Sequence, residues 1–87
     1  MSADHSHVLS RQKAEKGLAL LKDAILDHLG TFPDGLRNSD LANDLGLMSD
    51  HEGQQRNYLT YSVLGLLLKE KEVVKHKRGT KIYYVRA

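Results

Sequence analysis

The polar side chains with the most suggestive spacing in this chain form a short run just before an apolar segment. Glutamine, asparagine and arginine carry several hydrogen-bonding groups each, and tyrosine and threonine add hydroxyls, so the run can make many directional contacts. A polar front half followed by an apolar back half is typical of a helix that is anchored at one end and reads a surface at the other. The candidate residues are Gln54, Gln55, Arg56, Asn57, Tyr58, Thr60 and Tyr61.

A second group of candidates is mainly cationic and lies near the C-terminus. The segment Val73–Ala87 holds five lysines and arginines and no carboxylate, a charge of +5, whereas the other 72 residues hold eight cations and eleven carboxylates, a charge of −3. Segregated positive charge indicates a surface that faces a polyanion. The candidate contacts to such a polyanion, including two residues at the start of an earlier helix, are Arg37, Ser39, Lys75, Lys77, Arg78, Gly79, Thr80 and Lys81.

The composition excludes several kinds of chemistry. The chain has no cysteine, which excludes disulfides, thiolate metal sites and cysteine nucleophiles. It also lacks a glycine-rich phosphate loop, an H-E-x-x-H pair and a motif that frames a nucleophile, so we expect no enzyme, no cofactor, no metal and no small-molecule substrate. With no apolar run long enough for a membrane span and no signal pattern, we expect a cytoplasmic, nucleoid-associated protein that contacts no membrane.

Apolar periodicity predicts three helices. The first spans Ser10–Leu29, after a flexible tail at 1–9 in which Asp4, His5 and His7 could hold a metal only weakly. The second begins at Asn38 and ends near Gly46. The third extends from about Gln54 to Leu68, although a capping-box pattern at Ser49 and Glu52 would allow a start near Asp50. Its predicted core face consists of Leu59, Val63, Leu66 and Leu67.

The C-terminal residues predict a β-hairpin. Two β-branched and aromatic runs, Val73–His76 and Lys81–Val85, are separated by the short connection Lys77–Thr80, which contains Arg-Gly. The tip of this hairpin would be almost purely cationic. Leu36–Arg37, between the first two helices, could add a minor strand to the same sheet.

The order of these elements resembles the bacterial and archaeal winged-helix DNA-binding domains. The segment SDLANDLGL is similar to the first helix and turn of their helix-turn-helix, and RNYLTYSVLGLLLKEKEVVKHKRGTKIYY is similar to their recognition helix and wing. Met48–Gly53 departs from the pattern because it is longer and more polar than a minimal turn. The resemblance implies one domain at 10–87 with an α+β, mainly α fold: a three-helix winged helix-turn-helix with a C-terminal β-hairpin wing.

The resemblance also implies a partner, double-stranded DNA, and a role in transcription regulation. The third helix would enter the major groove and the wing would contact the backbone. Arg56 suits guanine, whereas Gln54, Gln55 or Asn57 suits adenine. A homodimer through the long first helix would match a twofold-symmetric site. Three alternatives remain open: a winged helix for protein–protein contact, a module that targets a larger DNA-processing assembly of the restriction–modification type, and RNA binding.

Overall fold

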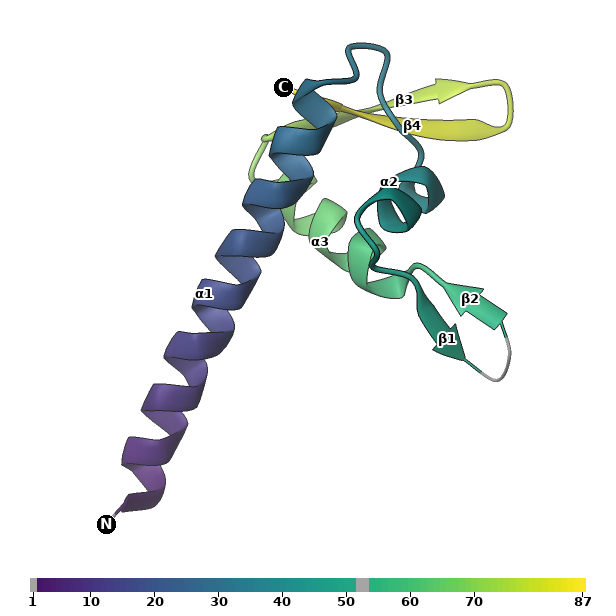
Figure 1. The fold of residues 1–87 in the computed structure, drawn as a ribbon. Coiled ribbons are helices and arrows are strands. Elements are labelled where there is room, and N and C mark those ends of the chain that lie inside the picture. The colour runs from purple at the N-terminus through teal and green to yellow at the C-terminus, as the bar shows by residue number, and fades with distance from the viewer. Residues whose placement is uncertain (1, 52–53) are drawn as a thin grey trace.

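The structure of this chain is a computed structural model that describes residues 2–51 and 54–87, with the side chains of residues 7–49 and 56–87. Within these residues, three helices and a C-terminal antiparallel hairpin form the predicted, mainly helical α+β layout (Figure 1). A second, smaller hairpin lies between the last two helices. The elements are α1 (Ser2–Gly30), α2 (Asn38–Asp44), β1 (Ser49–His51), β2 (Gln54–Arg56), α3 (Tyr58–Lys69), β3 (Val73–Arg78) and β4 (Lys81–Arg86).

The first helix is longer than the sequence pattern predicted. Helix α1 begins at Ser2, so the predicted start at Ser10 is wrong, and the backbone of residues 2–9 is helical. No glycine or proline interrupts this stretch, so the helix can continue without strain. The N-terminal half of α1 extends away from the rest of the fold (Figure 1). The side chains of Asp4 and His5, two of the three weak metal candidates, lie outside the described residues.

The hydrophobic core forms where the C-terminal half of α1 meets the other two helices and the wing. Ile25 and Leu29 of α1 pack in one cluster with Leu41 of α2 and Leu64 and Leu67 of α3. An ion pair and a hydrogen bond brace the same helices: Lys22 Nζ lies 2.7 Å from Glu70 Oε2, and His28 Nε2 lies 2.9 Å from Asp44 Oδ2.

The predicted core face of α3 was partly wrong. Val63 and Leu67 are buried as expected, but Leu59 and Leu66 are exposed, and Thr60 and Leu64 take their places in the interior. Leucine and valine fill most positions from residue 63 to 68, so the sequence itself leaves the rotation of the helix undetermined. Packing against α1 and α2 selects the face 60, 63, 64 and 67, which has proper helical spacing.

The wing is the antiparallel pair β3–β4, in which Val73 pairs with Arg86 and Arg78 pairs with Lys81. This confirms the predicted hairpin, but the predicted connection Lys77–Thr80 was too long, because Lys77 and Arg78 are paired residues of β3. Leu36, in the segment that could have added a minor strand, forms an isolated β-bridge to the wing instead: its N–H donates to the Tyr84 carbonyl at 3.0 Å, and the Tyr84 N–H donates to the Leu36 carbonyl at 2.8 Å. The loop after α1 is therefore hydrogen-bonded directly to the wing.

Gly35 makes this backbone contact possible. It has φ +87°, and a Cβ atom placed on it would lie 2.7 Å from the Tyr84 carbonyl oxygen and 2.8 Å from Val85 Cγ2. Any side chain would therefore combine left-handed backbone strain with a collision against the wing.

We predict that Gly35→Ala lowers the free energy of unfolding by about 2–4 kcal/mol, because strain and overpacking add. Urea unfolding followed by circular dichroism measures this loss. The matched control is Gly46→Ala, since Gly46 also has a positive φ of +69° but has open space around the Cβ position. The control should lose only about 1–2 kcal/mol. Equal losses at the two positions would show that the close approach to the wing costs nothing.

Candidate nucleic-acid interface

A small hairpin replaces the predicted first turn of the third helix. Gln54, Gln55 and Arg56 lie on strand β2, which pairs with β1 so that Ser49 is opposite Arg56. The prediction that these three residues stand on the recognition helix is therefore wrong. A run of polar residues carries no hydrophobic periodicity, so its pattern does not distinguish a strand from a helix here. The side chains of Gln54 and Gln55 lie outside the described residues, and Arg56 is half-buried.

Asn57 is the N-cap residue of α3. Its carbonyl accepts the N–H of Tyr61 at 3.1 Å, but its side chain makes no capping hydrogen bond. An asparagine at this position usually caps the helix with its side-chain oxygen. The half-buried Asn57 side chain therefore contributes no capping bond to α3, although it stands at the helix start.

Only some of the residues that were predicted to contact DNA bases lie on the exposed face of α3. Tyr58 and Tyr61 are 59% and 62% exposed. Thr60 is fully buried, and its hydroxyl has no hydrogen-bond partner, so the prediction that Thr60 contacts a ligand is wrong. The reason is again the rotation of α3, which points position 60 into the core.

The start of α2 carries a salt bridge rather than a free cation. The Arg37 guanidinium donates two hydrogen bonds to the Asp40 carboxylate, from Nε at 3.0 Å and from Nη2 at 3.1 Å. These bonds lower the pKa of Asp40 below its ordinary value of 3.8, against the opposing effect of desolvation, and the charge of Lys81 lowers it further. Arg37 was predicted to meet a phosphate, but its charge is already paired. Ser39, half-buried, lies in the first turn of the same helix.

The five cations of the wing fall into two groups, arginines that bond to backbone carbonyls and lysines that do not. Both arginines donate to backbone carbonyls of the α1 region, Arg78 to Asp34 and Arg86 to Leu26. Arg78 also lies over the ring of Tyr83, 4.4 Å from its centroid. Arg78, predicted as a direct ligand contact, therefore holds the wing in place.

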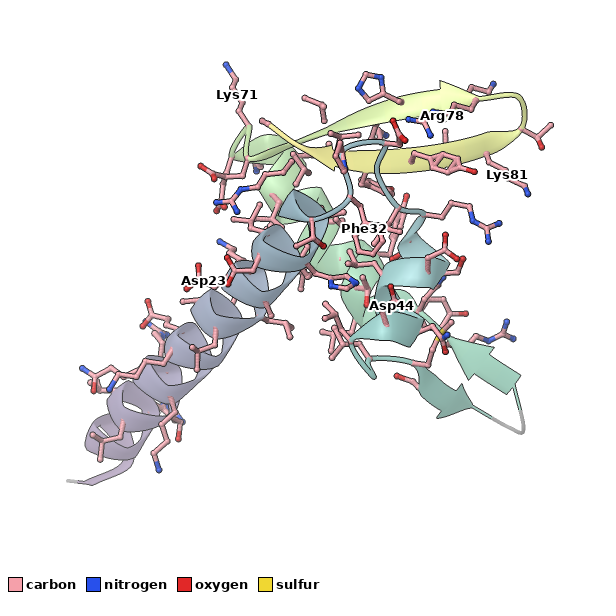
Figure 2. All side chains as sticks on the ribbon, turned by 45° about the horizontal axis from the view of Figure 1, so that its top comes forward. Asp23, Phe32, Asp44, Lys71, Arg78 and Lys81 are labelled. Carbon is pink, nitrogen blue, oxygen red and sulfur yellow. The ribbon has the colours of Figure 1, made fainter. Side chains whose placement is uncertain are left out.

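The three lysines of the wing, Lys75, Lys77 and Lys81, are exposed, and none takes part in the hydrogen bonds or ion pairs found among the described side chains. Gly79 and Thr80 form the exposed turn between the strands, where Gly79 adopts a positive φ of +64°. Figure 2 shows Arg78 and Lys81 close to this end of the hairpin. The lysines are therefore the wing cations available to an external anion.

Sequence reasoning missed the residues that support this arrangement. Arg37 and Asp40 stand three positions apart at a helix start, a spacing that favours an ion pair and could have been recognised. The stacking of Arg78 on Tyr83 follows from their diagonal positions across the hairpin, once its register is known. The bond from Arg78 to the Asp34 carbonyl has no counterpart in the sequence pattern, because it joins residues 44 positions apart.

We predict that Asp40→Asn removes a pH-dependent contribution to stability. Because the folded-state pKa of Asp40 is lowered, its contribution is fully present above pH 3.8 and is lost as the pH falls through the folded-state value. The wild type should exceed the variant in unfolding free energy by at most about 1 kcal/mol near neutral pH, because the pair is partly exposed. Urea titrations from pH 7 to pH 2.5 measure this difference.

The control for this experiment is Glu15→Gln, because Glu15 is exposed on α1 and is absent from the hydrogen bonds and ion pairs of the described side chains. It should leave the stability unchanged at every pH. A wild-type advantage over Asp40→Asn that persists in acid would contradict an electrostatic origin.

Neither a pocket nor a group of three metal-binding side chains occurs in the part of the chain that the structure describes. No helix in this part is long and apolar enough to cross a membrane. The candidate interface is thus not a pocket but a set of exposed residues on α3 and exposed lysines on the wing, with Lys75 and Lys77 on one side of the hairpin and Lys81 on the other. No family model matches this chain, and neither a curated protein nor a solved structure matches it.

Proposed function

We propose that this chain is a sequence-specific double-stranded DNA-binding protein that acts in the cytoplasm as a transcriptional regulator, without a cofactor and without catalysing a reaction. The observation that carries the proposal is the wing, which presents Lys75, Lys77 and Lys81 to solvent on a hairpin with no carboxylate. Phosphate backbones are bound by lysines and arginines placed in this way. The fold around the wing, with helices α2 and α3 beside it, is similar to an arrangement that DNA-binding proteins use.

The rigidity of the wing supports the same proposal. A flexible hairpin would lose conformational entropy on binding, whereas this one is tied to the α1–α2 loop by Arg78 and by the Leu36–Tyr84 bridge. The lysines therefore project from a hairpin whose position relative to α3 is already set. Such preorganisation favours a defined register on DNA.

A specific observation favours a second candidate, a winged helix that contacts another protein. Tyr58, Leu59, Tyr61 and Leu66 of α3 are all exposed large hydrophobic residues. Exposed apolar patches often mark protein interfaces. On this alternative, which includes a module that targets a larger DNA-processing assembly, neutralising the wing would have little effect on function.

The test of DNA binding is fluorescence anisotropy on a random-sequence duplex, titrated across salt concentrations. We expect a log–log slope that corresponds to about 3–6 released counterions. Lys77→Ala/Lys81→Ala should weaken binding to all sequences alike and reduce the magnitude of the slope by about 2, because two phosphate contacts are lost.

The matched control is Arg11→Ala/Lys71→Ala, which removes the same net charge from exposed positions outside the wing strands. It should change the slope much less than the wing variant. Equal effects of the two double variants would mean that net charge, and not the wing, drives binding. Absence of binding at low salt would turn attention to protein partners, and binding to duplex RNA with equal affinity would contradict the choice of DNA.

We further propose that the partner at α1 is a second copy of this chain in antiparallel orientation. Five exposed positions follow a coiled-coil spacing on the face of α1 opposite the core, namely Lys13, Lys16, Leu20, Asp23 and Asp27. Leu20 is 70% exposed, and Figure 2 shows Asp23 on the side of α1 away from α2. In a twofold antiparallel pair, Leu20 would meet Leu20 of the second copy and the lysines would face its aspartates.

Charge reversal tests this dimer. Lys13→Glu/Lys16→Glu and Asp23→Lys/Asp27→Lys should each be monomeric in sedimentation equilibrium at concentrations where the wild type is a dimer, because like charges would meet across the pair. An equimolar mixture of the two variants should recover the dimer. A wild type that stays monomeric, or variants that remain dimeric, would exclude this interface.

A further inference from the structure

The outward face of α3 carries carbon atoms where a base-reading helix often carries amides or guanidinium groups. Tyr58, Leu59, Tyr61 and Leu66 expose side-chain carbon on this helix. The sequence of α3, YLTYSVLGLLLK, holds one charged residue, Lys69 in the last turn, and neither asparagine nor glutamine. Apart from Lys69, the exposed hydrogen-bonding groups of α3 are the hydroxyls of Tyr58, Tyr61 and Ser62.

This composition limits which bases α3 can distinguish. In the major groove, guanine is read by arginine or lysine, adenine by asparagine or glutamine, and cytosine by a carboxylate. Thymine alone among the four bases presents an apolar group there, its C5-methyl, which apolar side chains contact. An apolar helix face therefore matches thymine better than it matches the other three bases.

Gly65 adds a second, independent observation. It is exposed in the interior of α3, where glycine is less favourable than alanine by about 1 kcal/mol. A Cβ atom on Gly65 would meet nothing within 4 Å, so packing inside the fold does not require a glycine here. An external surface that approaches the helix backbone closely would account for it.

Helix α3 also packs against the wing. Leu64 and Leu67 of α3 lie in the core cluster with Val73 of β3 and Tyr84 of β4, so the helix and the hairpin are joined in one packed unit. On the hairpin, Lys75 pairs with Tyr84 and Lys77 pairs with Ile82, so both lysines share the side of the wing that carries Tyr84. The exposed carbon of α3 and the cations Lys75 and Lys77 are thus carried by two elements that pack on each other, whereas Lys81 lies on the other side of the hairpin.

We infer that α3 reads thymine through its C5-methyl group in the major groove, with the side chains of Tyr58, Leu59 and Tyr61 as the methyl contacts and Gly65 as the point of closest approach. This inference rests on the proposed DNA binding and specifies what the protein selects. Wing lysines bind any backbone, and the apolar face of α3 adds affinity where thymines are suitably placed. Preferred sites would therefore be rich in A·T pairs.

The test uses random-sequence duplex pools that differ only in C5-methyl groups. One pool contains thymine and cytosine, a second replaces thymine by uracil, and a third contains uracil together with 5-methylcytosine. Anisotropy at one salt concentration gives the affinity of the full chain for each pool. We expect the thymine pool to bind at least about tenfold more tightly than the uracil pool, since each methyl contact contributes about fourfold and two or more are made.

The three pools separate the possible outcomes. Weaker binding to uracil supports the inference whether or not 5-methylcytosine restores affinity, and restoration would show that the methyl group suffices on either pyrimidine. Equal binding to the thymine and uracil pools overturns the inference while leaving DNA binding intact. Absence of binding to every pool overturns the proposed function and this inference together.

A variant at Gly65 tests the close approach without loss of folding. Gly65→Leu should unfold at the same or a higher temperature, because leucine favours helix and the position is open. It should reduce the preference for thymine over uracil from about tenfold to near one, since the added side chain keeps α3 out of the groove. Gly17→Leu, at an equally open exposed position on α1, is the matched control and should retain the preference. A Gly65→Leu variant with undiminished preference would overturn the role of α3.

Discussion

The backbone bridge between Leu36 and Tyr84 fixes the position of the wing relative to the helices. It depends on the absence of a side chain at Gly35, where the loop passes within van der Waals contact of β4. Tyr84 is itself buried in the core, so the same residue joins the sheet, the loop and the helical cluster. Because one residue has these three roles, the cationic hairpin cannot move independently of α3.

The fold uses most of its arginines for structure and leaves lysines for the outside. Arg37 is paired with Asp40, while Arg78 and Arg86 are bound to backbone carbonyls. A guanidinium presents several donors in a rigid plane, so it suits fixed internal bonds, whereas an ammonium on a flexible stem suits contacts with a diffuse polyanion. The same separation explains why the positive charge of the C-terminal segment overstates the number of cations that are available to a partner.

The sequence predicted the order of the elements because its turn residues and its hydrophobic periodicity were distinct. Gly30 and the turn residues after it separated α1 from α2, and the β-branched runs around Arg78-Gly79 defined the wing and its tip. It failed where these signals were weak. The polar residues up to Arg56 have no pattern that predicts a strand. The leucine-rich residues after Val63 are apolar on every side, so they do not predict which face of α3 is buried. Both errors concern the candidate site. Thr60 was expected on the exposed face of α3, whereas Gln54, Gln55 and Arg56 were expected on the helix instead of on strand β2.

The order of helices and hairpin, the segregation of positive charge and the absence of cysteine chemistry follow from composition and local pattern, so they could be predicted from the amino acids alone. The availability of individual cations, the outward side of α3 and the position of the wing against Gly35 depend on tertiary packing. These properties arise from contacts between residues far apart in the chain, such as Arg78 with Asp34 and Lys22 with Glu70. Local patterns carry no information about such pairs, since each depends on the packing of whole elements against one another.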